Sequence, residues 1–389
     1  MKKLAVLLVL AACGDNIKGE TEVGPDAAVM PWAEATPSSM PQLVTLGGPV
    51  LAQPKIQPIF FANDALQAQV ETFLAQLTTS SYWRAAATEY GVGAPSVLPT
   101  IVTTAAPPVN DTDLPAWMTA RFPTADPNTI YALFFGDGMV LHSQGGDSCT
   151  GYLAFHDETQ DSHGAPLVYA FMPRCEPETS FDHAQSKLDE LTISLSHELL
   201  EAATDPRVET APAFGDVDDD HAILEIMPGA ENGDLCEDRD TAYIHGVGDF
   251  MVQRTWSNAA ATAGHDPCVP APPTTYLAAA PVFTESVSLS GFGDSRMTKA
   301  MKLPVGTSKT IEVDVYSDTP TPEEYAIDAT DDSGELTFAW DKPSGKNGDK
   351  LHLTITRARA ASQGPGSVFT LSTKTGAGTI SEWIGYVSN

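Results

Sequence analysis

The chain has 389 residues, with 21 Lys and Arg against 51 Asp and Glu, so its formal net charge is −30. Only 19% of the residues are charged and 42% are hydrophobic, so the chain can bury a core and is not a disordered acidic tail. A surface this negative repels nucleic-acid phosphates and anionic lipid headgroups, and we expect neither as a partner. The length predicts two or three domains.

The N-terminal residues resemble an export signal. Two lysines precede the apolar run 4–10, which is far shorter than the roughly 20 residues of a membrane-spanning helix. The ending 10–13, Leu-Ala-Ala-Cys, resembles a bacterial lipoprotein signal; the alternative is an ordinary signal peptide with an incidental cysteine. We therefore expect residues 1–12 to be removed and Cys13 to carry a lipid anchor. Gly14 after the cysteine favours the outer membrane or cell surface of a Gram-negative bacterium.

Composition then divides the chain into regions. Residues 13–46 are rich in Gly, Pro, Ala and Thr without a hydrophobic period, and we expect a flexible tether there. Strand-like runs alternate with helical patterns over 47–268, which predicts a layered, zincin-like α/β domain. A proline-rich linker at 269–275 precedes residues 276–389, whose short alternating runs and turn signals predict an all-β sandwich with an accessory role.

The elements follow in chain order. In the α/β region we predict strands at 56–61, 97–102, 130–135 and 167–171. We predict helices at 65–77, 81–90, 114–122 and about 183–204. In the C-terminal region we predict strands at 286–290, 310–315, 336–340, 350–356, 367–371 and 381–387.

Four cysteines remain after Cys13. An even number in an exported chain predicts two disulfides, for which three connectivities exist. We favour Cys149–Cys175 and Cys236–Cys268, because neighbours in sequence close the shorter loops. Each would stabilise the fold by about 3–4 kcal/mol through loop entropy. The chain has no CxxC pair, which disfavours a cysteine zinc knuckle or a thioredoxin-type site.

The helix predicted at 183–204 carries the residues best suited to chemistry. At about 100° per residue, His197, Glu198, Glu201 and Asp205 share a polar strip beside a wide apolar arc. This pattern predicts a mostly buried helix whose polar strip forms the floor of a cleft. The helix is expected to end before Pro206, because the residue preceding a proline disfavours the α conformation.

His197 and Glu201 lie at i and i+4, so both side chains can bind one cation. With Glu198 as general base, this is the layout of a zincin, except that Glu201 replaces the second histidine. Zinc is our first choice, whereas calcium and manganese stay open because carboxylates also suit them. Candidates for a third ligand are Asp205, Glu231 and Asp234. The alternative is a solvated helix face that binds no metal.

Other polar motifs give weaker signals. The acidic run 216–220 has Asp at alternate positions, as in a calcium-binding loop, but His221 and Met227 replace the glycine and glutamate of an EF-hand. We expect a looser calcium-binding or solvated loop there. Among the scattered histidines, which we expect to be structural or exposed, His156 is the better candidate ligand. The chain has no GxSxG or P-loop motif, which disfavours serine-hydrolase chemistry and nucleotide hydrolysis.

Several segments together resemble the phosphate-induced, or Exordium-like, family of exported proteins. The matching segments are 47–51, 54–61, Tyr82-Trp83, Cys149 with Gly151-Tyr152, 196–206, 231–236 and 253–258. The most specific are the His-Glu-x-x-Glu-x-x-Thr-Asp-Pro helix and the Glu-x-Gly-Asp-x-Cys segment, and the resemblance spans about residues 47–268. It implies an extracytoplasmic location, a metalloprotease-like appearance and a pairing of the His197 helix with Glu231 and Asp234. It implies no settled activity.

These observations lead to one functional expectation and two alternatives. We expect an exported, lipid-anchored surface protein with a metal-dependent, zincin-like hydrolase site, a peptidase being the first candidate. Its expected partners are the membrane, through the lipid on Cys13, and a peptide or cell-surface polymer. The alternatives are a non-catalytic surface or adhesion module and a calcium-stabilised structural protein, so whether the protein is an enzyme stays open.

Overall fold

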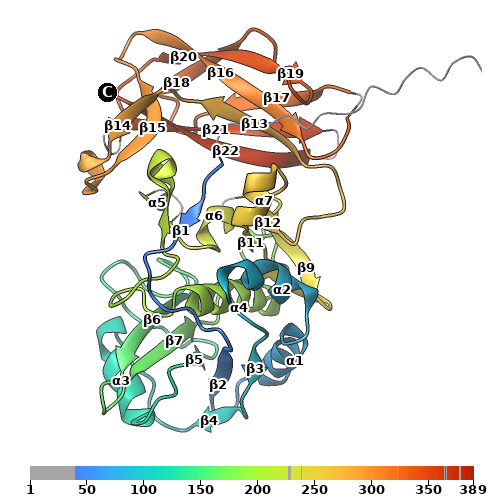
Figure 1. The fold of residues 1–389 in the computed structure, drawn as a ribbon. Coiled ribbons are helices and arrows are strands. Elements are labelled where there is room, and N and C mark those ends of the chain that lie inside the picture. The colour runs from blue at the N-terminus through green and yellow to red at the C-terminus, as the bar shows by residue number, and fades with distance from the viewer. Residues whose placement is uncertain are drawn as a thin grey trace, which may run out of the picture. The chain divides into compact units, whose positions relative to one another are not determined.

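The computed structural model describes residues 40–389, apart from 227–228, 238, 322, 363, 365 and 376–377 (Figure 1). The predicted signal peptide, Cys13 and most of the predicted tether lie outside the described residues. Among the helices of the described chain, we find none with the length and apolar character needed to cross a bilayer.

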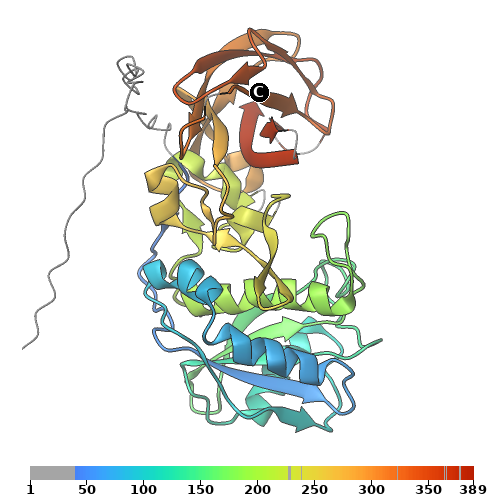
Figure 2. The same cartoon turned by 90° about the vertical axis from the view of Figure 1, so that its right-hand side faces the viewer.

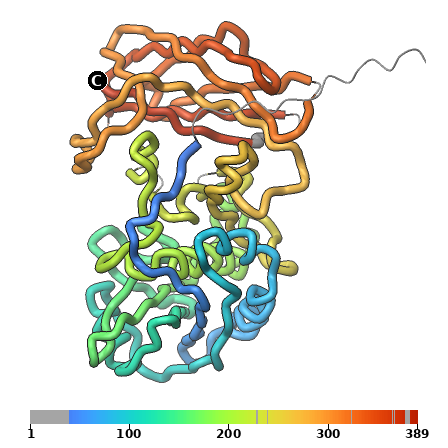
Figure 3. The backbone as a smooth tube through the Cα atoms, in the orientation of Figure 1, coloured from blue at the N-terminus to red at the C-terminus, as the bar shows by residue number. Residues whose placement is uncertain are grey.

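Ordered structure begins earlier than the sequence predicts. Strand β1 (Leu43–Val44) pairs antiparallel with β8 (Asp216–Val217), and the blue start of the tube in Figure 3 follows this path. The side chains of Met40 and Leu43 are buried. The predicted tether boundary at residue 46 is therefore wrong, because a few apolar side chains in a polar stretch are enough to anchor it when a partner strand is available.

The α/β region is built on a sheet of six strands. Its order is β3-β2-β5-β7-β6, and β4 also pairs with β2. The strands are β2 (Lys55–Phe61), β3 (Ser96–Val97), β4 (Ile101–Thr103), β5 (Thr129–Phe134), β6 (Phe155–Gln160) and β7 (Pro166–Met172). All pairs are parallel except β6 with β7. The run predicted as one strand at 97–102 is divided between β3 and β4, and Pro99, which has no N–H to donate, lies in the gap.

Helices cover both faces of this sheet. In β5, Ile130 and Phe134 face one apolar layer while Tyr131 and Leu133 face the other, as the two-residue period of a strand requires. The first layer contains helices α1 (Gln67–Leu77), α2 (Ser81–Ala87) and α4 (Lys187–Thr204), and the second contains α3 (Leu114–Arg121). Helices and a mainly parallel sheet confirm the predicted α/β class for this region.

Helix α4 is the central element of the first layer. It begins after Ser186, whose hydroxyl accepts a hydrogen bond from the Asp189 N–H and caps the helix, so it starts later than the predicted residue 183. From Glu190 to Thr204 every residue except Ser194 is buried, which agrees with the wide apolar arc. The helix, light green in Figure 2, crosses the sheet and also contacts β10.

Short elements follow α4 in the chain, and one of them, β10, packs against it. They are α5 (Ile223–Ile226), α6 (Asp234–Glu237), β9 (Tyr243–Val247), β10 (Phe250–Gln253), β11 (Thr255–Trp256), α7 (Asn258–Ala263) and β12 (Cys268–Val269). Strands β9 and β10 form an antiparallel hairpin, and β11 pairs with β12. Both predicted disulfides, Cys149–Cys175 and Cys236–Cys268, are present.

The C-terminal region contains two sheets that share an apolar core. The first has the order β13-β16-β20-β18 and the second β14-β15-β22-β21-β17-β19. The strands are β13 (Leu277–Val282), β14 (Glu285–Ser288), β15 (Met297–Lys302), β16 (Ser308–Ser317), β17 (Tyr325–Thr330), β18 (Leu336–Trp340), β19 (Ser344–Gly345), β20 (Lys350–Arg357), β21 (Gly366–Thr375) and β22 (Gly378–Ser388). Val313 of the first sheet and Leu371 of the second lie in the same core, as expected of a β-sandwich.

Candidate metal centre

The polar strip of α4 opens into a cavity of about 380 Å³. His197, Glu198 and Glu201 line it together with residues of β6, α6 and the β9–β10 hairpin. Six carboxylates line the cavity: Asp182, Glu198, Glu201, Glu231, Asp234 and Glu237. No Lys or Arg belongs to the lining that the structure describes. The predicted cleft floor is therefore present, and it is strongly acidic.

His197 and Glu201 contact each other across one turn of α4. The Nε2 atom of His197 lies 2.9 Å from Oε2 of Glu201 and 3.5 Å from Oδ1 of Asp234. Only 11% of the His197 side chain and 3% of the Glu201 side chain are exposed. The structure thus brings the helix pair together with one of the three candidates that we named for a further ligand.

Backbone donors fix the orientation of the Glu201 carboxylate. Its Oε1 atom accepts hydrogen bonds from the N–H groups of Gly233 and Asp234, at 3.0 and 3.2 Å. Oε2 is therefore the oxygen that faces the imidazole of His197. The close approach of the backbone at residue 233 to Glu201 requires a glycine, because a Cβ there would lie 2.6 Å from Glu201 Oε1.

Gln253, the last residue of β10, orients the ring of His197. Its side-chain NH2 donates to the backbone oxygen of Gly233 at 2.8 Å, which leaves Oε1 to accept from His197 Nδ1–H at 3.0 Å. The lone pair of Nε2 then points at the carboxylates. An acceptor that holds the other ring N–H in this way is the usual support of a metal-binding histidine.

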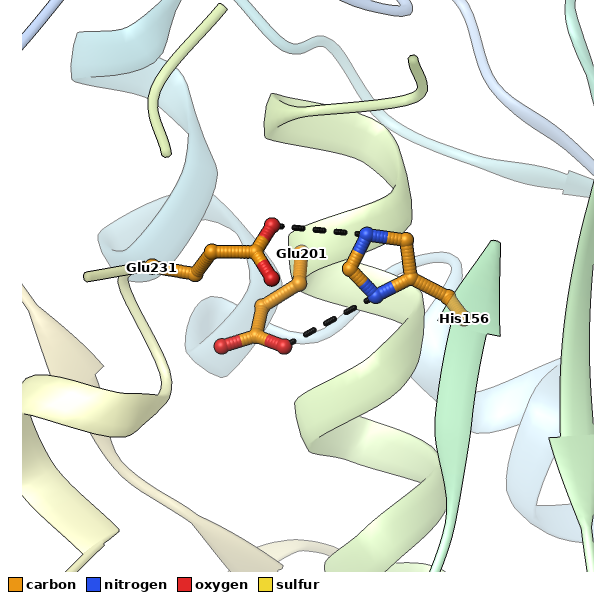
Figure 4. Close-up of side chains that lie close together, drawn as sticks. All are labelled: His156, Glu201 and Glu231. Carbon is orange, nitrogen blue, oxygen red and sulfur yellow. Dashed lines mark ion pairs between the residues drawn. The ribbon is translucent and has the colours of Figure 1, made fainter. Parts of the chain in front are cut away.

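His156, on the edge strand β6, enters the cavity from the sheet side. Its Nδ1 lies 3.2 Å from Glu198 Oε2 and 3.8 Å from Glu201 Oε2. Its Nε2 lies 3.4 Å from Glu231 Oε1 (Figure 4). The same nitrogen lies 3.3 Å from the backbone oxygen of Asp205. Both ring nitrogens therefore face only oxygens that accept hydrogen bonds.

Burial and charge act in opposite directions on the two histidines. Burial alone would lower the pKa of His197, but the charges of Glu201 and Glu198 raise this pKa well above its usual value. The pKa of His156 is likewise raised well above its usual value, because Glu231 and Glu198 outweigh the effect of burial. Burial raises the pKa of Glu201 well above its usual value, although His197 opposes the shift. Burial also raises the pKa of Asp234.

Two acidic features named from the sequence have other contacts. The carboxylate of Asp205 accepts from the Ala213 N–H at 2.7 Å, and its backbone oxygen, not its side chain, contacts His156. Burial raises the pKa of Asp205 to about 6. In the run 216–220, Asp218 accepts from the N–H groups of Gln42 and Asp220. Within the described residues, both groups of side chains close enough to share a metal ion lie in the α4 cavity.

Two residues of this site carry only weak signals in the sequence. His156 belongs to β6, whose sequence FHDETQ lacks an apolar period, so no strand was predicted there. Gln253 entered only as part of the family resemblance, and a lone glutamine at a strand end gives no local signal. The position of Cys149 shortly before β6 was the one available indication that this segment is held in place.

The disulfides lie next to the elements that carry the site. Cys236 belongs to α6 together with Asp234, and it is linked to Cys268 of β12. Cys149 precedes β6 and is linked to Cys175, which follows β7. Each bridge thus restrains a segment that supplies side chains to the cavity. Two disulfides are typical of proteins in oxidising compartments.

Comparisons with known proteins give only distant likenesses. No family model matches the sequence, and no curated protein matches it. Domains 4 and 5 of the S-layer protein SbsC are 14% identical over 28% of this chain and 52% of that chain, with a TM-score of 0.18. Domains 1–6 of the same S-layer protein are 7% identical over 64% of this chain and 37% of that one, also with a TM-score of 0.18. The matches thus cover about half or less of those chains, and such values carry no argument about fold or function.

Proposed function

We propose that the protein is an exported, lipid-anchored hydrolase whose metal centre lies in the α4 cavity, with a zincin-like arrangement of the α4 residues and a peptide as first candidate substrate. We also retain the Exordium-like assignment of residues 47–268 as a proposal.

One observation carries the metal proposal. The nitrogens of His156 and His197 face only acceptor oxygens, and a nitrogen so placed must hold a proton or bind a cation. The cavity adds six carboxylates and no basic side chain among its described lining. Because imidazole accompanies the carboxylates, zinc or manganese suits the donor set better than calcium, which prefers oxygen ligands alone.

The residues of the cavity would have different roles in hydrolysis. His197, Glu201 and Asp234 would hold the metal, which acidifies water and polarises a carbonyl oxygen. Oε2 of Glu198 is engaged by His156, which leaves Oε1 to accept a proton from the attacking water. Water adds to the carbonyl carbon, the C–N bond breaks, and Glu198 returns the proton to the leaving amine.

The test is elemental analysis of the purified mature protein, followed by a peptide-cleavage assay. We expect His197→Ala to lose the ion that His197, Glu201 and Asp234 hold, whereas Glu198→Gln keeps this ion and loses cleavage. Glu158→Gln is the control, since Glu158 contacts Thr210 outside the cavity. Absence of metal after supply of zinc, manganese and calcium would refute the proposal.

The predominance of oxygen donors also favours one alternative, a calcium-stabilised structural protein. It predicts a melting temperature that rises with calcium and not with zinc. A non-catalytic surface module predicts that Glu198→Gln changes no activity or phenotype while metal stays bound.

A further inference from the structure

The donors of the cavity form two sets that share one carboxylate. His197, Glu201 and Asp234 are the His197 group, and His156, Glu201 and Glu231 are the His156 group. In each group one donor atom per residue lies within 4.8 Å of the others. Glu201 is common to both, and its Oε2 lies 2.9 Å from His197 Nε2 and 3.8 Å from His156 Nδ1.

The spacing in both groups fits the ligand shell of a small divalent cation. Atoms bound tetrahedrally to zinc at about 2.1 Å lie about 3.4 Å from one another. His197 Nε2 lies 3.5 Å from Asp234 Oδ1, and His156 Nε2 lies 3.4 Å from Glu231 Oε1. Each Nε2 atom thus has one carboxylate oxygen at ligand spacing. The shared Glu201 lies near Nε2 of His197 and on the Nδ1 side of His156, within the spacing of both groups.

Each ring also has its own acceptor on the opposite nitrogen. Gln253 Oε1 takes the Nδ1–H of His197 at 3.0 Å, and Glu198 Oε2 takes that of His156 at 3.2 Å. With Nδ1 engaged, the Nε2 atoms face Asp234 and Glu231 respectively. A site for one metal ion with a single histidine ligand needs only one imidazole that is oriented in this way. This cavity has two.

Glu231 faces His156 with an oxygen that is shielded from solvent. Its Oε1 atom makes no hydrogen bond, and the Nε2 atom of His156 lies 3.4 Å away as its ion-pair partner. A cation between these two atoms would give the buried oxygen a closer positive charge than the imidazole does. The six carboxylates of the lining also exceed the charge that one divalent cation neutralises.

We propose that the cavity is a two-cation centre in which Glu201 bridges the two ions. His197 and Asp234 hold the first ion, and His156 and Glu231 hold the second. This inference rests on the proposed function, because it places both ions in the same cavity. Paired ions about 3.5–4 Å apart stabilise the attacking and leaving oxygens of a displacement. In this arrangement Gln253 is a positioning residue for His197. Oε2 of Glu198 orients His156, while its Oε1 stays available as the base.

The experiment counts metal in the full mature protein. The protein is stripped with a chelator, dialysed against Mn²⁺ or Zn²⁺ and analysed for bound metal. Glu231→Gln and Asp234→Asn form a matched pair, since each removes one charge from a side chain that is 21% exposed. We expect two equivalents in the wild type and one in each variant. Glu237→Gln, which alters the same lining outside both groups, should keep two.

A second readout tests the bridge. Two Mn²⁺ ions joined by Glu201 are spin-coupled, so the wild-type paramagnetic resonance spectrum should differ from that of isolated ions, and Glu231→Gln should restore the isolated-ion pattern. Circular dichroism and thermal melting show whether each variant is folded.

The outcomes separate the two proposals. No bound metal overturns both. One equivalent in the wild type, or two uncoupled ions of which Glu231→Gln removes none, overturns the two-cation centre and leaves a single-metal hydrolase standing. Two coupled ions, one lost with each member of the matched pair, support the inference.

Discussion

Oε1 of Gln253 lies 3.0 Å from Nδ1 of His197, and this contact decides which ring nitrogen faces the carboxylates. The amide cannot turn over without cost, because its NH2 group donates to the backbone oxygen of Gly233. The side chain of Gln253 therefore connects β10 to His197 of α4 and to Gly233 in the loop between Glu231 and Asp234. It holds these segments in one arrangement.

Replacing Gln253 by Leu should weaken metal binding by about 10–100-fold, because the ring of His197 loses the acceptor that orients it. Competition with a chromogenic chelator measures the dissociation constant. Gln57→Leu is the matched control: Gln57 is also buried, but its NH2 group donates to the backbone oxygens of Pro58 and Pro99. Equal affinity losses in both variants would show that Gln253 matters for general stability only.

Gly233→Ala should disturb the centre by crowding. The new Cβ would lie 2.6 Å from Glu201 Oε1 and 2.8 Å from His197 Nδ1, closer than real Cβ contacts. We expect a fall in the free energy of unfolding of about 1–3 kcal/mol, together with weaker metal binding. Urea unfolding and the chelator assay measure the two effects. Gly145→Ala, whose Cβ would meet nothing closer than 3.7 Å, should change neither.

Local sequence patterns predict those parts of the site that depend on neighbours in the chain. The burial of α4 follows from its apolar arc, and the pairing of Cys236 with Cys268 follows from short loop closure. His156 and Gln253 were given little weight because each lies far in sequence from α4 and reaches the cavity only through sheet pairing and a hairpin. Asp205 continues the polar strip of the helix wheel, but α4 ends before it and its carboxylate turns to the Ala213 N–H.

Glu190, which does not line the cavity, predicts a pH dependence of stability. It lies in the first turn of α4, is 2% exposed, and accepts from the Glu178 N–H at 2.9 Å. Burial, and then the charge of Asp182, raise its pKa from 4.5 to about 8 against the effect of that hydrogen bond. The folded state thus binds this proton more tightly than the unfolded chain. The resulting stability is complete below the unfolded pKa near 4.5 and is lost as the pH rises to about 8.

Glu190→Gln imitates the protonated carboxyl, so its stability should fall less between these pH values than that of the wild type. At pH 8 we expect the variant to be the more stable protein, and near pH 4 we expect little difference. Urea unfolding at several pH values, with chelator present, measures this. Glu176→Gln, at a side chain that is 80% exposed, should follow the wild-type profile. Parallel profiles for Glu190→Gln and the wild type would contradict the prediction.

Asp205 and Asp234 should give opposite results when each is replaced by Ala. Asp205 satisfies the buried N–H of Ala213, so Asp205→Ala should lower the free energy of unfolding by about 1–3 kcal/mol with little loss of metal. Asp234 faces His197 at 3.5 Å and is partly exposed, so Asp234→Ala should lose the ion that His197 holds and change the stability of the metal-free protein little. Equilibrium dialysis measures the first property, and urea unfolding in chelator measures the second. If Asp205→Ala removed metal as completely as Asp234→Ala, the helix-wheel assignment of Asp205 as a ligand would be right and the geometry of the cavity would need another explanation.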